Sequence, residues 1–306
     1  MTELEKKATI IICTCNRARS LKRTLDSFFS IYSQPLVEVL VVDNNSSDDT
    51  KNICLGYKSQ GVKYLFQPVV GLSHARNFGL EHMDRDIAIF VDDDVTFRGG
   101  WLENLLLPFQ RNDVGVVGGE LLPVWEVPRP DWLSDHRLGN YSVCLNWSSQ
   151  TKEIEGDEWL CEGNIAFWKS ALDAAGRFPV NLGRIGPILL SGEGAVVDVI
   201  RYNGMKAVFS PASVVDHHIS KGRLSPKWLA KRIFWQGITQ GVVEEYLRQK
   251  IDFNGMNHEW RDLRLPTDMK TWASIFNSLP DSNFEQRLNE LYDLGYALQR
   301  TGFIDN

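Results

Sequence analysis

Three consecutive carboxylates, Asp92, Asp93 and Asp94, have the clearest capacity for chemistry in this chain. Two like charges about 4 Å apart repel by roughly 4 kcal/mol at an effective dielectric constant of about 20. A divalent cation relieves this repulsion directly, and carboxylate oxygens are ligands that Mg²⁺ and Mn²⁺ prefer. A solvated acidic turn is the alternative. Because the triplet follows a strand expected at residues 87–91, at the ligand-binding edge of a sheet, we favour the metal site.

Polar residues also stand where the first two expected strands end. Thr14, Asn16 and Arg17 come after the first strand, and Asp43 ends the second. Ligands bind beyond the carboxyl ends of parallel strands, so these side chains are candidates for binding a nucleotide. The Asp43 carboxylate would accept a hydrogen bond from a base imide or a ribose hydroxyl. Asp48, by contrast, is expected to cap the helix that follows.

Residues 71–77 precede and begin a helix, for which Ser73 is the expected N-cap. Arg76 then lies on the first turn, where its planar guanidinium suits bidentate contact with a phosphate. The alternative partner is the acidic triplet, and both interpretations bring Arg76 to the same site. The chain contains no GxGxxG fingerprint and no GxxxxGK(S/T) loop, which argues against a dinucleotide-dependent dehydrogenase and a P-loop NTPase.

The elements that must position these residues alternate along the first half of the chain. Continuous apolar strands separated by helices predict an α/β fold with a mostly parallel central sheet and helices on both faces. We predict one α/β domain at residues 1–220 and a helical C-terminal extension at residues 221–306. Strands are expected at residues 8–13, 37–42, 62–66, 87–91, 114–117, 165–168 and 207–210, and helices from Ser20 and at residues 72–83, 101–109, 227–241, 242–250 and 284–300.

Residues 123–158 interrupt this alternation. The segment is rich in proline, tryptophan and charge, and Trp125 and Trp132 are among its aromatic residues. Loops of this length in compact domains are usually functional or mobile. We therefore expect an irregular insertion that has a role at the site.

Composition narrows the possible classes of protein. The 306 residues carry a formal net charge of -6, and 43% are hydrophobic and 24% charged, as in ordinary globular proteins. The negative charge argues against a dedicated nucleic-acid binder. No apolar run reaches about 18 residues and the first run lacks a signal-peptide cleavage site, so we expect a cytoplasmic protein. The five scattered cysteines are expected to be reduced structural thiols.

Four segments of the chain, taken in order, resemble the family 2 glycosyltransferases. They are the strand ending in Thr-Cys-Asn-Arg, the Val-Val-Asp-Asn-Asn segment, Ala-Arg-Asn-Phe-Gly and Phe-Val-Asp-Asp-Asp, at residues 9–17, 41–50, 75–79 and 89–94. The resemblance continues more loosely through Gly163 and Asn164 and through the strand that ends at His217. Between residues 178 and 193 it is to members from bacterial polysaccharide assembly.

The resemblance implies the GT-A fold, a nucleoside diphosphate sugar as donor and a divalent metal, Mn²⁺ or Mg²⁺. UDP is the commonest nucleotide in that family. Asp43 would contact the base, and Asp92 with Asp94 would form the metal and ribose-phosphate site. His217 would complete the metal shell, although a buried or capping histidine is the alternative because His218 stands beside it.

One position departs from the family pattern. The family usually has a second carboxylate after the glutamate of this Gly-Glu segment, and that group is the usual catalytic base, but here the position is Gly194. The remaining candidates are Glu193, which we favour, and Asp198, one helical turn beyond Gly194 on the same side. In the inverting transfer that the resemblance implies, this base takes the acceptor hydroxyl proton. If neither serves, the chain is a weak or inactive sugar-nucleotide-binding partner protein.

Basic residues follow the expected metal histidine. Lys221 and Arg223 come soon after His217 and either close over the diphosphate or form a solvated basic loop. The helix expected at residues 227–241 mixes basic and aromatic residues. Such a helix can lie on an anionic membrane as a peripheral contact, but more commonly its aromatics pack onto the core.

The acceptor that the resemblance implies is a glycan or a lipid-linked glycan. We expect it beside Gly163 and Asn164 and against the insertion, at Trp125 and Trp132. A nucleotidyltransferase is a rival class because it shares a related fold. Those enzymes usually begin with a glycine-rich loop after the first strand, and residues 14–19 contain no glycine, so the sequence favours glycosyl transfer.

Overall fold

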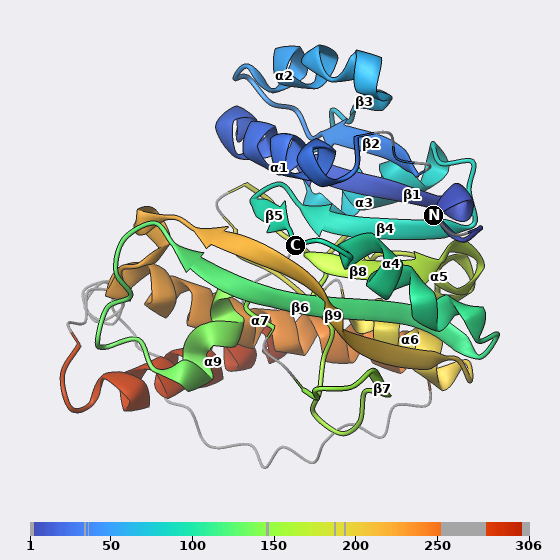
Figure 1. Ribbon diagram of the computed structural model, residues 1–306. Helices are drawn as coiled ribbons and strands as arrows, with labels where there is room; N and C mark the ends of the chain where they lie inside the picture. The colour runs from blue at the N-terminus through green and yellow to red at the C-terminus, as the bar shows by residue number, and fades with distance from the viewer. Residues whose placement is uncertain are drawn as a thin grey trace.

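The computed structural model describes residues 3–33, 35, 37–144, 147–186, 188–192, 194–251 and 280–301. The strands are β1 Ala8–Thr14, β2 Glu38–Asp43, β3 Val62–Phe66, β4 Ile87–Asp92, β5 Val95–Phe97, β6 Val114–Trp125, β7 Lys152–Glu153, β8 Asn164–Trp168 and β9 Lys206–Ile219. The helices are α1 Ala18–Ile31, α2 Thr50–Gly56, α3 Leu72–Glu81, α4 Trp101–Leu106, α5 Lys169–Ala175, α6 Ala195–Tyr202, α7 Pro226–Lys250 and α9 Phe284–Arg300. Within the described residues the strands form one sheet, in the order β3-β2-β1-β4-β8-β6-β9-β5, with β7 paired to β9. Figure 1 shows α7 and α9 beside the β6–β9 end of this sheet.

The first four strands pair in parallel because helices carry the chain back between them. β1 pairs with β2 and β4, and β2 pairs with β3. Right-handed crossovers put α1 and α3 on opposite faces, because the chain moves outward from β1 to β3 and then returns to β4. On the α3 face, a Cβ added to Gly79 would come within 2.6 Å of Ile11. Both faces are covered, which explains the continuous apolar strands and confirms the predicted fold class.

The rest of the sheet is mixed. β8 lies antiparallel between β4 and β6, while β5 and β7 pair antiparallel with β9. The long strands β6 and β9 are parallel, so most paired residues still lie in parallel ladders. Both are longer than predicted: the strand expected at residues 114–117 continues to Trp125, and the one expected at 207–210 continues to Ile219. The expected irregular insertion therefore begins only after Trp125.

Several helix boundaries also differ from the sequence-based expectations. The helices expected at residues 227–241 and 242–250 are one continuous helix, α7, and the one expected at 101–109 leaves the α-helical form after Leu106. Ser20 does not cap α1. The helix begins two residues earlier, at Ala18, whose N–H donates to the Asp48 carboxylate at 2.9 Å.

Ser73 was also predicted as an N-cap, and this is wrong. Gly71 is the N-cap of α3, with a φ of 149° that few other residues adopt. The Ser73 hydroxyl instead donates to the Leu182 carbonyl oxygen at 2.8 Å. Asp49, not Asp48, is the N-cap of α2, but the Asp48 carboxylate accepts a hydrogen bond from the N–H of Thr50, the first residue of that helix, at 3.1 Å.

The insertion packs onto the C-terminal helices and forms a second hydrophobic cluster with them. Leu133 and Tyr141 of the insertion belong to this cluster together with Leu288 of α9. At its edge, the Arg137 Nε donates to the Glu285 carboxylate at 2.8 Å. The extension predicted at residues 221–306 thus shares a core with residues before its boundary, and the division at residue 220 stays a prediction.

Helices α7 and α9 approach each other at glycines. A Cβ added to Gly237 would lie 2.0 Å from the Tyr292 carbonyl oxygen, and one added to Gly295 would lie 2.1 Å from that of Phe234. Any larger side chain at either glycine would push the two helices apart. None of the helices in the described segments combines the length and apolar character needed to cross a membrane.

Candidate active site

The parallel register brings the predicted polar residues to one edge of the sheet. Thr14 lies opposite Asp43, and Cys13 lies opposite Asp92. A cavity of about 370 Å³ opens at this edge, beyond the carboxyl ends of β1 and β4, where such sheets bind ligands. Its polar lining among the described residues includes Thr14, Arg17, Asn44, Arg76, Asp92, Asp93, Asp94, Glu162, Arg184, Ser191, Arg223 and Arg232.

Asp92 is the most exposed member of the acidic triplet. It ends β4, and its side chain retains 31% exposure. The buried Arg76 lies beside it, with Nη2 4.0 Å from Oδ1 of Asp92. The Arg76 guanidinium also lies 5.3 Å from the centre of the Phe178 ring, and this packing holds it in place. Both interpretations of Arg76, a partner of the triplet and a phosphate ligand at the cavity, are compatible with this position.

Asp93 turns away from the candidate metal position and is held inside the protein. Its carboxylate accepts a hydrogen bond from the Thr14 hydroxyl at 2.5 Å, and Nε of Arg17 lies 3.2 Å from it. Burial raises the pKa of Asp93 to about 7, against the opposing effect of Arg17. A buried carboxylate needs such partners to stay in the folded protein, so Asp93 anchors the triplet to β1.

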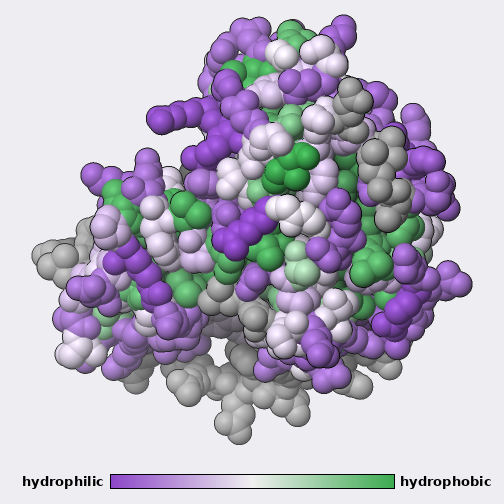
Figure 2. All heavy atoms as spheres, viewed as in Figure 1, coloured by the Kyte–Doolittle hydropathy of each residue, from purple (hydrophilic) through white to green (hydrophobic). Residues whose placement is uncertain are grey.

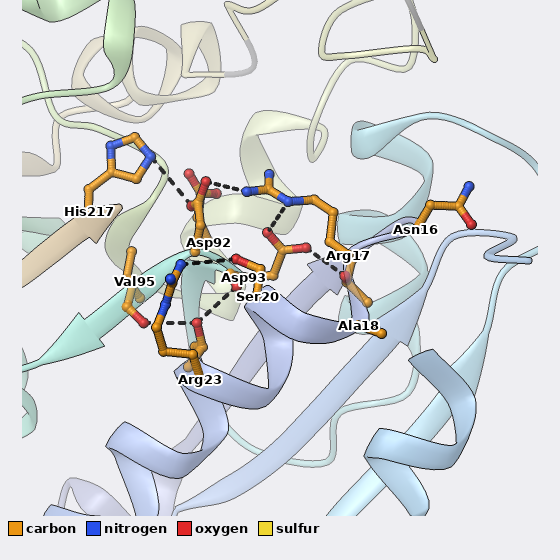
Figure 3. A network of polar contacts seen from close by, with 12 residues as sticks. Asn16, Arg17, Ala18, Ser20, Arg23, Asp92, Asp93, Val95 and His217 are labelled. Atoms are coloured by element: carbon orange, nitrogen blue, oxygen red, sulfur yellow. Dashed lines mark hydrogen bonds and ion pairs between the residues drawn. The ribbon is translucent and has the colours of Figure 1, made fainter. Parts of the chain in front are cut away.

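Asp94 is buried against His217. Strands β5 and β9 pair so that Val95 lies opposite His217, and the His218 N–H donates to the Asp94 carbonyl oxygen at 2.9 Å. This places Nε2 of His217 3.4 Å from Oδ1 of Asp94. Burial alone would raise the pKa of Asp94, but His217 and Arg17 lower it well below its usual range. Figure 3 shows the His217 ring and the Arg17 guanidinium converging on these carboxylates.

The residues at this point fit a divalent cation. One ligand atom from each of Asp92, Asp94 and His217 lies within 4.8 Å of the others. Oδ1 of Asp94 is buried without a hydrogen-bond partner, although buried polar atoms are normally satisfied. A cation bound by carboxylate oxygens and an imidazole nitrogen would account for such a set. His217, of the two neighbouring histidines, is thus the one that faces the carboxylates.

Arg223 also belongs to the site, whereas Lys221 does not. Nη1 of Arg223 lies 3.4 Å from Nε2 of His217, and its guanidinium lies 5.0 Å from the centre of the Trp228 ring. Burial lowers the pKa of Arg223 to about 10, which still leaves it charged at neutral pH. Lys221 is exposed, and its backbone N–H donates to Glu126.

Of the residues predicted to bind the nucleotide in the first two loops, some line the cavity and others do not. Thr14 and Arg17 line the cavity. Asp43 is buried beside it, and its two carboxylate oxygens accept from the Ser46 N–H at 2.9 Å and the Tyr64 hydroxyl at 2.8 Å. The Asp43 carboxylate can also accept from a base, because each oxygen has a second lone pair.

Asn16 is turned away from the carboxylates in Figure 3. It has a positive φ of 55°, and its side-chain oxygen accepts from the Ser47 N–H at 2.7 Å. It joins the loop after β1 to the loop after β2 and does not line the cavity. Asn44, which the sequence did not single out, does line it. Its side-chain oxygen accepts from the Gly71 N–H at 2.7 Å, which fixes the start of α3 and hence Arg76.

The residues predicted for the acceptor are not brought together. Gly163 lies at the cavity, where an added Cβ would be 2.7 Å from Oδ2 of Asp92. Asn164 is fully buried; its side-chain oxygen accepts from Nε1 of Trp101 on α4, and its Nδ2 donates to the Glu120 carbonyl oxygen of β6. The two tryptophans predicted for the acceptor, Trp125 and Trp132, pack against the second hydrophobic cluster and do not line the cavity.

The two candidate bases have different outcomes. Glu193 lies outside the described residues. Asp198 is exposed on α6 and lies 3.8 Å from Arg201, away from the cavity. The reason is the burial pattern of this short helix, which directs Ala195 and Val199 with their apolar neighbours into the core. The structure therefore does not bring Asp198 to the site.

The basic and aromatic face of α7 is largely accounted for by packing. Trp228, Phe234 and Trp235 lie against the hydrophobic clusters, and the exposed Lys227 and Lys231 carry the charge. On the face drawn in Figure 2, apolar side chains form separate green patches among hydrophilic purple ones. Membrane contact by residues 227–241 stays a prediction.

Sequence reasoning missed three charged residues of the cavity lining: Glu162, Arg184 and Arg232. Glu162 directly precedes the Gly163 and Asn164 segment that carries the resemblance, so its position was the available signal. Arg184 and Arg232 come from a loop and a helix whose place at the cavity depends on the tertiary fold.

This geometry defines the class of the protein. A sheet of this topology, with a carboxylate and histidine group at the carboxyl ends of its strands and arginines around a cavity, is that of a glycosyltransferase with the GT-A fold. Residues 9–169 match the family model described as glycosyl transferase family 2. Because the match spans more than half of the chain, the protein belongs to that family.

Two curated relatives are similar over most of their length. The chain is 26% identical over 252 residues to the glucosyl-dolichyl phosphate glucuronosyltransferase of Haloferax volcanii, a match that covers 80% of each chain. It is 28% identical over 260 residues to the succinoglycan biosynthesis protein ExoM of Rhizobium meliloti, covering 81% of this chain and 77% of the relative.

Solved structures confirm the fold. The mannosyltransferase PcManGT of Pyrobaculum calidifontis, in complex with GDP-Man and Mn²⁺, aligns with a TM-score of 0.58 at 18% identity, over 98% of this chain and 76% of that one. TarS 1-349 of S. aureus, in complex with UDP, aligns with a TM-score of 0.55 at 15% identity, over 98% of this chain and 93% of that one.

Proposed function

We propose that this glycosyltransferase moves a sugar from a nucleoside diphosphate sugar, with UDP as the first nucleotide to test, to a hydroxyl group of a glycan or lipid-linked glycan. The transfer is inverting and requires a divalent cation. The observation that carries the proposal is the convergence of Asp92, Asp94 and His217 at the cavity, where Oδ1 of Asp94 is buried without a hydrogen-bond partner.

The chain offers ligands for both the cation and the diphosphate. Asp92, Asp94 and His217 would hold Mn²⁺ or Mg²⁺, which would supply Lewis-acid stabilisation of the departing diphosphate. Arg76 and Arg223 border the same position, with nitrogens 4.0 Å from Asp92 and 3.9 Å from Asp94. Guanidinium groups at this range suit bidentate contact with phosphate oxygens. These arginines therefore orient the donor and compensate its charge.

The acceptor class is supported by the relatives. One is named for a glucosyl-dolichyl phosphate substrate and the other for succinoglycan biosynthesis. Both names point to glycan assembly, and the first to a sugar carried on a lipid. The donor class is supported by the structural neighbours, which were solved with GDP-Man and with UDP.

The reaction needs a base for the acceptor hydroxyl. The sequence predicts Glu193, which precedes Gly194 in the chain, for this role. A base of this kind must lie within about 3 Å of the proton that it removes. If Glu193 is the base, Glu193→Gln will reduce turnover far more than donor binding, and unchanged turnover would remove Glu193 from the role.

Calorimetric titration with UDP, GDP and dTDP, in Mn²⁺ and then in EDTA, tests the donor half of the proposal. We expect one nucleotide to bind in Mn²⁺ and to bind at least about tenfold more weakly in EDTA, because metal ligation contributes to the affinity. Binding of none of them under either condition would contradict the proposal. Binding without any sugar transfer would instead indicate the sugar-nucleotide-binding partner that Gly194 suggests.

A further inference from the structure

Glu162 brings a carboxylate to the boundary between the cavity and the first turn of α6. It is half-buried and lines the cavity. A Cβ added to Gly194, the N-cap of α6, would lie 2.2 Å from Oε1 of Glu162 and 3.2 Å from its Cδ. The end of a helix where the amide groups point outward favours a negative charge. The fold therefore positions an anionic group at this point, although residue 194 itself supplies none.

The neighbouring residue ties Glu162 to the candidate metal site. The Asp92 N–H donates to the Gly163 carbonyl oxygen at 3.3 Å, and a Cβ on Gly163 would be 2.7 Å from Oδ2 of Asp92. Residues 162 and 163 thus contact α6 on one side and Asp92 on the other. A carboxylate held in this way lies close to the place where a donor bound at Asp92 must be attacked.

The other carboxylates of the described lining already have roles. Asp93 is held by Thr14 and Arg17, and Asp92 and Asp94 form the candidate metal group with their neighbouring histidine. Among the described cavity residues, Glu162 is the carboxylate that neither of these arrangements uses.

The backbone conformation at position 194 does not require a glycine. Its φ of -63° and ψ of -9° are open to every residue. A side chain there would collide with the Glu162 carboxylate at 2.2 Å. A side chain at position 194 and the Glu162 carboxylate would therefore share the same space unless Glu162 moved aside. The sequence lacks the expected carboxylate at residue 194 and carries one at residue 162 that reaches the same point.

We propose that Glu162 is the catalytic base of the transfer, an inference that rests on the proposed function. Its carboxylate takes the proton of the acceptor hydroxyl as that oxygen bonds to the anomeric carbon. The bond between the anomeric carbon and the donor phosphate oxygen breaks, and its electron pair leaves with the nucleoside diphosphate. General base catalysis of this kind contributes about 10²–10⁴-fold to the rate.

The test measures nucleoside diphosphate release from a sugar nucleotide, with water as the acceptor, alongside calorimetric binding of the nucleoside diphosphate and Mn²⁺. We expect Glu162→Gln to reduce kcat by about 10²–10⁴-fold and to leave the nucleotide affinity within about threefold. Glu155→Gln is the matched control, because Glu155 is exposed, is not part of the cavity lining, and should retain full activity. Glu193→Gln is measured in parallel.

A second comparison moves the carboxylate across the contact. Glu162→Gly alone should be as slow as Glu162→Gln, and Glu162→Gly combined with Gly194→Asp should recover at least about tenfold, because the new side chain enters the vacated space. If Glu162→Gln also loses nucleotide binding, the comparison of Glu162→Gly with the double variant still tests whether a carboxylate at this point is the base. Recovery supports the proposal, and no recovery overturns it.

The remaining outcomes separate this inference from the proposed function. If Glu162→Gln leaves turnover unchanged and Glu193→Gln abolishes it, the role of Glu162 is overturned. The proposed glycosyl transfer is then left intact. A wild-type protein that releases nucleoside diphosphate from none of the donors would overturn the proposed function, and the inference with it.

Discussion

Replacing adjacent aspartates of the triplet one at a time should damage the protein in two different ways. Asp93→Ala is expected to lower stability, because it removes the partner of a buried ion pair and the acceptor of the Thr14 hydroxyl. Breaking such a pair costs about 3–5 kcal/mol when both charges are buried. The Arg17 side chain is 39% exposed and can be hydrated, so we expect about 2–3 kcal/mol. This corresponds to roughly 4–12 °C in Tm for a domain of about 150–250 residues.

Asp92→Ala should have the opposite profile. Its side chain is 31% exposed and its contact with Arg76 is 4.0 Å long, so the unfolding free energy should change by less than about 1 kcal/mol. Removing this candidate ligand should weaken Mn²⁺-dependent nucleotide binding by at least about tenfold. Thermal unfolding followed by circular dichroism and calorimetric Mn²⁺ titration measure the two effects. Equal losses of Tm in both variants would refute the division of roles that we derive from their burial.

Other perturbations test separate parts of the structure. His217→Ala should abolish Mn²⁺-dependent nucleotide binding, whereas His218→Ala should leave it within about twofold, because of the two rings that of His217 faces the carboxylates. Equal losses of binding in calorimetry would contradict this assignment. Gly295→Ala should destabilise the protein by about 1–3 kcal/mol because its Cβ meets a backbone oxygen at 2.1 Å, while Gly56→Ala, with open space around it, should not; equal Tm values would argue against the close helix contact. Co-sedimentation with anionic liposomes tests membrane contact by residues 227–241, and the absence of binding would exclude it.

The part of the site that follows strand ends could be predicted from the sequence. Asp92 comes directly after an apolar strand, and Arg17 comes soon after another. Parallel pairing with β1 then brings both to one edge of the sheet. Such residues can be found because a local pattern identifies the strand and a general rule identifies its functional end.

The rest depended on contacts between distant segments. Glu162 reaches the cavity from a loop before β8, and its significance appears only when α6 packs against it. Asp198 matched the helical spacing, but that spacing alone does not say which side of α6 faces the core. Asn164 occurs in the expected segment, yet its side chain is held by hydrogen bonds with α4 and β6 in the protein interior. In each case the tertiary packing decided the role.

The irregularity in the pairing of β6 with β9 has a consequence for how this site can change. Between two consecutive residues of β6, β9 advances from Ser210 to Val214, so it carries three residues without a counterpart. Side chains alternate along a strand, and an odd number of extra residues therefore decides which of His217 and His218 faces Asp94. Deleting one of the three unpaired residues should place His218 in the position that His217 now has. Mn²⁺ binding would then be lost in His218→Ala instead of in His217→Ala. A change in the length of this bulge can thus change which histidine is the metal ligand, without substitution of either histidine.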